Sequence, residues 1–535
     1  MTGRGKTITL VAMTLASSMI LVDQTAVPLA TSHAVSELGG SLGDGQWILT
    51  ANILPLAALM IAGGQLGDRF GLRKIFLLGA VLFAGATATA ASSVNMTMMI
   101  TARAVQGVGA AMMMPTAVAI VEVVYPVEKR GSALGVLAGG SAFFAALGPV
   151  LGGLLTGIDW RLVFWINVPL AIITIALTLA FTPPLTPTAD KGGIDHWGIV
   201  TFAIGLVGLV YGLGEVSATG PTDPQVLIPF AIGALALEVF VFIERAQKSP
   251  MIDFRLLRRR NLLAANISQF LAGSIELGLG FLLPYFYLLA IGISPEAAGL
   301  ALLPATVPII VAGPLAGKAY DRVGPRLPLV LGFLVLAASG VALAAATSEL
   351  SPWAMIPGLL LQGAGLGVVL TVNDPTGLGA VSESDSGQAA GMLNTSEQFG
   401  GAVGIAVLGA LELDYYRSRL YDKLADRGLF PNAQQAEQFR DFILDAEQYG
   451  LRHTPQDAAV VKLALADSIA SRIPAFELTF LVTSGISVLG AVVVLVLVES
   501  GRPHHPTGVF SRRSRWVLDR NDRKKALPAA HRLGS

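Results

Sequence analysis

The chain has 535 residues, of which 53% are hydrophobic and only 13% charged, whereas about a quarter of the residues of an ordinary soluble domain are charged. Its mean hydropathy of +0.65 excludes a water-soluble globular protein, because so apolar a chain is stable only in lipid. Lys+Arg and Asp+Glu both number 36, so net charge gives no sign of a nucleic-acid partner. The chain has no cysteine, which excludes disulfides, thiolate chemistry and cysteine-ligated metal.

Apolar runs long enough to cross a bilayer, which needs about 20 residues per helix, recur along the whole chain. Fourteen are expected, near 8–32, 46–66, 74–93, 96–119, 131–156, 161–182, 197–215, 226–245, 261–290, 297–318, 327–346, 353–373, 389–412 and 475–498. An even number puts both termini on one side, and most lysines and arginines fall in the segments on that side. The positive-inside rule makes that side the cytoplasm, which predicts a multi-pass plasma-membrane protein with both termini cytoplasmic.

A short charged motif occurs twice. Gly64-x-x-x-Asp68-Arg69-x-Gly71-x-Arg73 matches Gly317-x-x-x-Asp321-Arg322-x-Gly324-x-Arg326 position for position, and each copy joins the second and third helices of a six-helix group. Two six-helix groups around a central cavity are the plan of a secondary transporter. The expected fold is therefore an all-α polytopic membrane protein of two six-helix bundles plus two inserted helices.

The repeat divides the chain into segments. They are an N-terminal bundle at 1–182, an inserted helix pair at 183–246, a cytoplasmic linker at 247–260, a C-terminal bundle at 261–498 and a basic cytoplasmic tail at 499–535. Within the C-terminal bundle, 413–472 mixes apolar and charged residues at helical spacing. This pattern predicts amphipathic helices outside the membrane, which either cover the exit of the cavity or are a tolerated insertion.

Two charged residues interrupt the apolar runs of the N-terminal half. Because a charge at the bilayer centre costs about 2.5–3.5 kcal/mol, each requires a partner, a wet cavity or a function. Counting residues along the helices at about 1.5 Å each places both Asp23 and Arg103 in the outer half of the membrane. We expect Asp23 to bind a proton from outside and release it inside, with Arg103 tuning it. The alternative is a static pair that only fixes helix packing.

Two glutamates are the acid candidates of the C-terminal half. Glu276 lies mid-helix among glycines that allow close helix approach, and it either binds a second proton or a cationic substrate, or stays protonated and hydrogen-bonded. Glu397 lies about two turns into the run at 389–412 and is a weaker candidate for the same proton-coupling role.

The charged motif itself is interpreted as a conformational latch. Asp68 would accept hydrogen bonds from the N-terminus of a helix in the other half, such as the one at 389–412, when the cytoplasmic gate is shut. Gly64, Gly67 and Gly71 would allow close approach and a tight turn. The alternative is a topology signal. The remaining latch residues are Arg69 and Arg73, expected to pair with acids such as Glu122, and Asp321 and Arg322 of the second copy, which is weaker because it contains Pro325.

Two further groups of residues are candidates for packing and binding. Gly148-Pro149-x-x-Gly152-Gly153 interrupts the fifth helix, and is either a tight, leak-proof seam or an ordinary proline kink. An aromatic and methionine-rich pocket for varied organic molecules would contain Met113, Phe143, Phe144, Phe281 and Tyr285. The alternative is that these side chains simply face lipid or neighbouring helices.

Five segments, taken in order, resemble a known family. GQLGDRFGLRK at 64–74, RAVQGVGAAMMMP at 103–115, GGSAFFAALGPVLGG at 139–153, WRLVFWINVP at 160–169 and PMIDFRLLRRRN at 250–261 resemble motifs of the major facilitator superfamily, in its fourteen-helix drug:proton antiporter branch. The resemblance covers nearly the whole chain. It implies that Arg103 takes part in proton coupling and that the 139–153 motif is typical of antiporters. Glu397 departs from it, because an arginine or glutamine is common there.

The function expected from these features is proton-coupled export of amphipathic organic compounds, cationic or neutral, from the cytoplasm. Two rivals remain open: a dedicated exporter of an endogenous lipid or antibiotic, and a non-transporting membrane sensor. No Walker loop and no nucleophile–base constellation is found in the sequence, so we expect neither ATP-driven transport nor enzymatic activity. We expect a monomer that interacts with protons, a small amphipathic substrate and membrane lipids. Its energy source would be the proton gradient, and it would need no cofactor.

Overall fold

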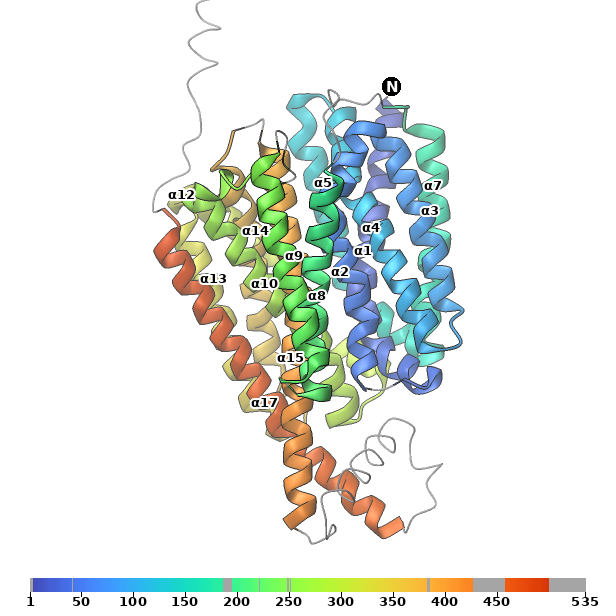
Figure 1. Ribbon diagram of the computed structural model, residues 1–535, viewed down its shortest axis with the longest axis vertical. Coiled ribbons are helices and arrows are strands. Elements are labelled where there is room, and N and C mark those ends of the chain that lie inside the picture. The colour runs from blue at the N-terminus through green and yellow to red at the C-terminus, as the bar shows by residue number, and fades with distance from the viewer. Residues whose placement is uncertain are drawn as a thin grey trace, which may run out of the picture.

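A computed structural model describes residues 3–499 except 41, 186–194, 221, 248–249, 251, 383–384 and 427–457. Within these ranges all regular structure is helical, as lipid requires, since a helix satisfies its own backbone hydrogen bonds. The basic tail expected at 499–535 lies outside the described residues, apart from Glu499. We call the end of the bundle that carries Gly3 the N-terminal face and the opposite end the distal face (Figure 1).

The N-terminal half is a bundle of six spans, as expected for 1–182. They are α1 (Gly3–Leu38), α2 (Leu42–Phe70), α3 (Leu72–Ala91), α4 (Met96–Val124), α5 (Val127–Ile158), and α6 (Leu162–Trp165) with α7 (Asn167–Phe181), which together make one span. α1 packs against α5 and α7, and α4 packs against α2 and α3. The half is therefore a closed helical unit with its own core.

The C-terminal half has six spans as well. They are α10 (Arg260–Tyr285) with the π-helical end η2 (Phe286–Ile291), α11 (Pro295–Ala301) with α12 (Leu303–Val323), α13 (Arg326–Ala346) with η3 (Thr347–Glu349), α14 (Ile356–Leu378), α15 (Ser386–Asp426) and α17 (Ala458–Leu497). Figure 1 shows this half, green-yellow to red, beside the blue and cyan N-terminal half.

The expected fourteen membrane helices are confirmed with one qualification. Of the described helices, 13 are long and apolar enough to span a bilayer. The fourteenth is α15, which lies inside the bundle against α10, α2 and α17. Its apolar character is diluted by polar residues such as Glu397 and Glu412, and these face protein rather than lipid.

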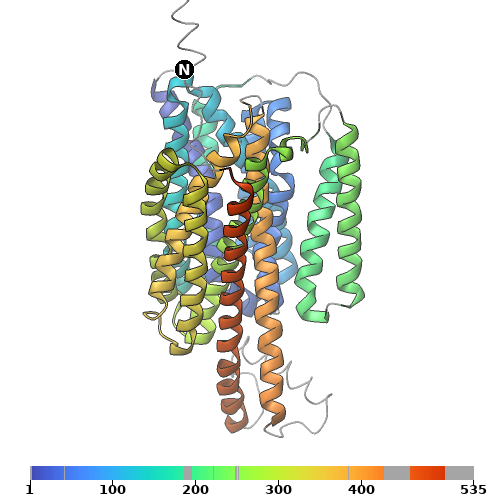
Figure 2. The same ribbon diagram turned by 90° about the vertical axis from the view of Figure 1, so that its left-hand side faces the viewer.

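The inserted pair is a helical hairpin, α8 (His196–Thr219) and α9 (Pro224–Ala246), beside the bundle. Figure 2 shows the two helices at one flank of the molecule. α8 packs against α15 and α2, one helix from each half. The described part of the linker that follows contains the 3₁₀ turn η1 (Leu256–Arg258), and the Ile252 N–H donates to Glu244 Oε2 at the end of α9 (3.2 Å).

The segment expected outside the membrane at 413–472 is shorter than its sequence pattern suggested. α15 continues without a break to Asp426, and α17 already begins at Ala458, so both helices extend the bundle beyond its distal face (Figure 1). Leu413, Tyr416 and Leu420 are buried. These three apolar positions therefore pack between helices, whereas Ile469 is 39% exposed. Residues 427–457 lie outside the described residues.

The two motif copies fold alike. Gly71 separates α2 from α3 with φ 101°, and Gly324 ends α12 with φ 84°, values that disfavour any residue with a Cβ. Arg73 donates to the Leu179 carbonyl near the end of α7 (2.7 Å), and Arg326 donates to the Leu495 carbonyl near the end of α17. Each arginine thus stabilises the exposed carbonyl end of the last helix of its own half.

The Gly71 turn generates a stability prediction. Replacing Gly71 by alanine should cost about 1–3 kcal/mol, because the backbone conformation there is strained for an L-residue. The melting temperature of the detergent-solubilised protein measures this. Gly85→Ala in α3 is the control, since an added Cβ there meets no atom within 4 Å, and it should not lower the melting temperature. Equal melting temperatures for the two variants would contradict the assigned role of Gly71.

Candidate functional site

A buried ion pair lies in the core of the N-terminal half. Arg103 Nη1 on α4 is 2.5 Å from Asp23 Oδ2 on α1, and both side chains are 1% exposed. The Gln106 amide donates to Asp23 Oδ1 at 3.1 Å, and Gln106 Oε1 accepts from Arg103 Nη1 at 2.6 Å. Both carboxylate oxygens are therefore hydrogen-bonded, as a buried charge requires.

The same arginine also holds α2 and α6. Its Nε donates to the Ile48 carbonyl at 2.8 Å, and its guanidinium carbon lies 5.7 Å from the centre of the Phe164 ring. Arg103 thus connects α1, α2, α4 and α6 through one side chain. A change in the charge of Asp23 would therefore alter contacts that involve four helices.

A second polar network lies in the C-terminal half, around Glu397 of α15. The Gln269 amide of α10 donates to Glu397 Oε2, and Gln269 Oε1 accepts from the Asn373 amide of α14. Gly273 allows this approach, because a Cβ there would collide with the Glu397 backbone. Glu276, half-buried on α10, lies within electrostatic range of Glu397. The structure thus brings the two acid candidates of this half together.

A hydrogen bond between two buried side chains crosses the interface between the halves. The Gln24 amide of α1 donates to Gln398 Oε1 of α15 at 2.9 Å. Gln24 follows Asp23 in the chain, and Gln398 follows Glu397. The bond therefore joins the halves at the level of the two acids.

The motif at 148–153 forms a seam with two faces. Gly148 and Gly152 lie against Thr25 and Ala26 of α1, where a Cβ would collide. Gly153 lies against the Pro295 carbonyl and Gly299 of α11, in the C-terminal half. Small residues allow this backbone contact between helices in lipid. The halves are thus packed closely together near the distal face.

Pro149 within this seam leaves one carbonyl without its helical partner. A proline has no N–H, so the carbonyl four residues earlier, at Ala145, loses its usual donor. The Thr25 hydroxyl of α1 donates to the Ala145 carbonyl at 3.1 Å, and the Pro149 carbonyl lies against Gly299. The proline is thus a packing element between α1, α5 and α11 as well as a break in the backbone ladder.

The candidate substrate residues do not form one pocket. Phe281 and Tyr285, with ring centres 4.6 Å apart, line a cavity of about 20 Å³ near the distal face, enough for about one water molecule. Met113 is fully buried in the N-terminal core, whereas Phe143 and Phe144 are 52% and 37% exposed on α5. The five residues are thus dispersed over three environments.

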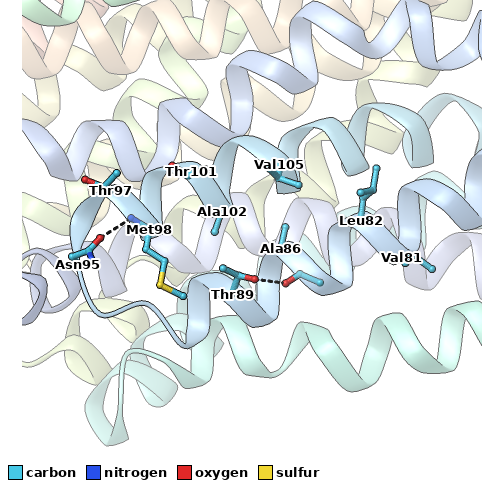
Figure 3. A pocket seen from close by; sticks show the side chains of 11 residues that line it. Val81, Leu82, Ala86, Thr89, Asn95, Thr97, Met98, Thr101, Ala102 and Val105 are labelled. Atoms are coloured by element: carbon cyan, nitrogen blue, oxygen red, sulfur yellow. Dashed lines mark hydrogen bonds between the residues drawn. The ribbon is translucent and has the colours of Figure 1, made fainter.

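A larger depression lies between α3 and α4. Its volume is 680 Å³, and Figure 3 shows Thr89, Asn95, Met98 and Thr101 among the residues around it. Val81 and Val105 are exposed, so it opens on the outside of the N-terminal half. It contains none of the candidate residues and lies apart from the interface between the halves.

The polar turn residues lie at the N-terminal face. Gly67 packs on Thr116 of α4 and Gly64 on Pro115, which holds the end of α2 close to α4. Asp68, Glu122 and Asp321 are exposed, as are Arg69 and Arg322. Within the part of the chain that the structure describes, no hydrogen bond or ion pair joins Asp68 to the other half, and Arg73 contacts the Leu179 carbonyl instead of the expected acid.

Comparison with known proteins identifies the family. The model of the Major Facilitator Superfamily matches residues 11–405, which include both motif copies, the Asp23–Arg103 pair and Glu397. The chain belongs to the Major Facilitator Superfamily. It is therefore a membrane transporter rather than an enzyme, as its sequence predicted.

Two relatives of this superfamily member are named for antibiotic export or drug resistance. It is 33% identical to the tetracenomycin C resistance and export protein of Streptomyces glaucescens over 79% of this chain and 78% of that protein. It is 28% identical to the multidrug resistance protein Stp of Mycobacterium tuberculosis over 83% and 82%. These relatives are consistent with the drug:proton antiporter branch.

Solved structures support the fold. A bacterial homologue of the human lysosomal transporter Spinster matches with a TM-score of 0.62, at 15% identity, over 95% of this chain and all of that one. The major facilitator architecture expected from the two motif copies is thereby confirmed.

Sequence reasoning missed several polar residues of this transporter. Gln24, Gln106, Gln269, Asn373 and Gln398 are buried. Gln106 and Gln269 bond charged side chains, Asn373 bonds Gln269, and Gln24 bonds Gln398. Their signal was available, because uncharged polar residues inside apolar spans also need partners.

Sequence reasoning also missed a buried pair near the distal face. Arg472 of α17 lies 3.6 Å from Glu412 of α15 and 4.2 Å from the centre of the Tyr416 ring, while the Tyr416 hydroxyl bonds Ser468 Oγ at 2.8 Å. These residues fall where the sequence pattern indicated solvent-exposed helices, so their burial was not predicted.

The role of the seam between α5 and α11 in transport can be tested by adding one methyl group at Gly153. Gly153→Ala would force α5 away from the Pro295 carbonyl, so we expect substrate efflux to fall about five-fold or more, as for a cost of 1 kcal/mol or above. Efflux of a fluorescent dye from cells provides the measurement. Gly139→Ala on the same helix, where a Cβ meets nothing within 4 Å, should retain normal efflux. The seam has no role in transport if both variants behave as the unmodified protein.

Proposed function

We propose that this transporter is a proton-coupled antiporter that exports amphipathic organic compounds, cationic or neutral, by alternating access. The observation that carries the proposal is the buried Asp23–Arg103–Gln106 cluster. Next to it in the chain, Gln24 joins the two halves through its hydrogen bond to Gln398. Titratable groups held in the protein interior of a membrane span mark ion and proton pathways. The names of the Streptomyces and Mycobacterium relatives support drug export.

The Asp23–Arg103 ion pair determines what binding and release of a proton at Asp23 would do. Protonation of Asp23 would remove its charge, so its attraction to Arg103 would weaken to an ordinary hydrogen bond. Arg103 would keep the Ile48 carbonyl and Gln106 as partners, which stabilises the cation while α1 moves relative to α4. Loss of the proton would restore the pair. The two protonation states thereby favour different arrangements of α1, which carries Gln24.

The described conformation fits one state of such a cycle. The close packing of α5 on α11 supports closure at the distal face, and the exposed Asp68 supports an open latch at the N-terminal face. In the opposite state, the seam would separate and Asp68 would reach the N-terminus of α15. We place the N-terminal face in the cytoplasm, on the positive-inside rule.

The energy required is available from the proton gradient alone. The membrane potential supplies about 2.3 kcal/mol per charge per 100 mV, and each pH unit adds about 1.4 kcal/mol. We propose the plasma membrane as the location, a monomer as the working unit and no cofactor.

A dedicated exporter of one compound is the second candidate. The name of the Streptomyces relative, a tetracenomycin C resistance and export protein, favours export of a single antibiotic by that protein. A panel of substrates separates the two: a multidrug exporter protects an efflux-deficient host against several unrelated compounds, whereas a dedicated one protects against one.

The proton-coupling role of Asp23 has a direct test. Asp23→Asn should abolish dye-dependent proton release in inverted membrane vesicles. Because a lone buried arginine costs about 3–5 kcal/mol, the double variant Asp23→Asn/Arg103→Gln serves to separate folding from coupling. It should recover the melting temperature but not the proton release.

The control for Asp23→Asn is the same substitution at a carboxylate outside the Asp23 cluster. Asp223→Asn, at the N-cap of α9, keeps a capping side chain and should leave proton release unchanged. Normal proton release by the Asp23 variants would rule out coupling through this residue, and active efflux without any proton movement would rule out the antiporter.

The latch has its own test. Asp68→Asn should slow dye efflux while surface expression stays normal, because a neutral amide interacts less with the positive end of a helix than a carboxylate does. Asp321→Asn, in the copy that contains Pro325, should have a smaller effect. If Asp68→Asn transports normally, the motif acts only as a topology signal and as the turn that contacts α7.

A further inference from the structure

An apolar cavity separates the inserted pair from the C-terminal half. Its volume is 440 Å³ and it lies between α8, α9, the linker, α10 and α15. This is within the range of about 300–1,000 Å³ typical of ligand pockets. Figure 2 shows the pair α8–α9 at the flank of the molecule, so the cavity lies on the membrane side of the bundle, away from the Asp23 cluster.

Aromatic rings form the two walls of this cavity. Phe202 of α8, Phe240 of α9 and Phe254 of the linker line one wall, with successive ring centres 4.9 and 6.1 Å apart. Phe270 and Phe399 line the wall of the C-terminal half, 5.6 Å apart. None of the described residues around the cavity is charged. Such walls suit a hydrocarbon chain, and they offer no counter-charge to a cationic drug.

The linker provides cations at the N-terminal end of the cavity. Ile252, Phe254 and Leu257 line the cavity, while Arg258 and Arg259 are exposed. No ion pair among the described residues engages either arginine. The linker is held in place, because Gln388 of α15 donates to the Pro250 carbonyl at 3.2 Å. Apolar and cationic groups thus alternate along one fixed segment at the membrane surface.

We propose that this cavity binds one anionic phospholipid from the leaflet next to the N-terminal face. One acyl chain lies between the two aromatic walls, and the phosphate lies against Arg258 and Arg259. Clustered basic residues beside a membrane helix attract anionic lipid headgroups, and arginine binds phosphate through paired hydrogen bonds. The proposal is independent of proton coupling and of the identity of the exported compound.

The position of the site gives the lipid a structural role. Asn266 and Ser396, which are hydrogen-bonded to each other at 2.8 Å, line the cavity. Glu397 and Gln269 are near neighbours of these residues in the chain. A bound acyl chain therefore packs behind the segments of α10 and α15 that carry the C-terminal polar network, and it fills the space between them and the inserted pair.

Native mass spectrometry of the full chain tests the proposal. The detergent-purified protein is mixed with phosphatidylglycerol and phosphatidylcholine of identical acyl chains. We expect about tenfold preferential retention of phosphatidylglycerol. Arg258→Gln/Arg259→Gln should abolish the preference, and the matched double variant Lys129→Gln/Arg130→Gln, exposed at the same face on α5, should keep it. Ile267→Trp, which fills the cavity, should reduce retention of both lipids.

Several results would overturn the proposal. Equal retention of the two lipids, or a preference that survives the Arg258/Arg259 change, would show that no anionic lipid site exists there. If Ile267→Trp leaves phosphatidylglycerol bound but removes binding of the cation ethidium, the cavity belongs to the transport substrate. The Arg258 and Arg259 side chains are on the surface, so their variant keeps the test decisive even if Ile267→Trp fails to fold.

Discussion

The ion pair between Asp23 and Arg103 is the interaction on which the N-terminal half depends. Two opposite charges that are each 1% exposed are tolerated in a protein interior only if every polar atom around them is satisfied. Here Gln106 and the Ile48 carbonyl complete the set. The positions of α1, α2 and α4 are therefore set by directional hydrogen bonds, whereas the surrounding apolar contacts tolerate sliding. In the proposed mechanism, protonation of Asp23 would act on this set of directional hydrogen bonds.

The contacts between the halves are of a different kind. Lipid provides no hydrophobic force to hold helices together, so close backbone packing takes its place. Gly153 and Gly299 allow α5 and α11 to meet backbone to backbone, and the Glu296 side chain of α11 lies beside Gly157 of α5 in the same contact. The hydrogen bonds of the Asp23 and Glu397 networks lie within each half, an arrangement that suits the proposed movement of one half against the other. The inserted pair, which touches α2 and α15, lies across the line where they meet.

The number and order of the helices could be predicted from the sequence because each span must be long and apolar. α15 was found as the apolar run at 389–412, although its polar residues give it a weaker signal. The partner of Arg73 could not be predicted, because it is a backbone carbonyl. Every residue has such a carbonyl, so the sequence does not mark the one at Leu179, which lies on another helix. The burial of Arg472 was missed for a similar reason: charged residues at helical spacing look the same whether they face water or each other. The proximity of Asp23 and Arg103 was one of the arrangements that the sequence allowed, since each buried charge required a partner, a wet cavity or a function.

The hydrogen bond between Gln24 and Gln398 affects the energy of the proposed movement between the halves. A bond between two neutral amides contributes only about 0.5–1.5 kcal/mol net, so thermal fluctuation breaks it readily. Each amide is both a donor and an acceptor, which lets it exchange its partner for water or for a hydroxyl or carbonyl of a passing molecule. If the halves separate as in the proposed cycle, either amide can therefore form a hydrogen bond with a new partner.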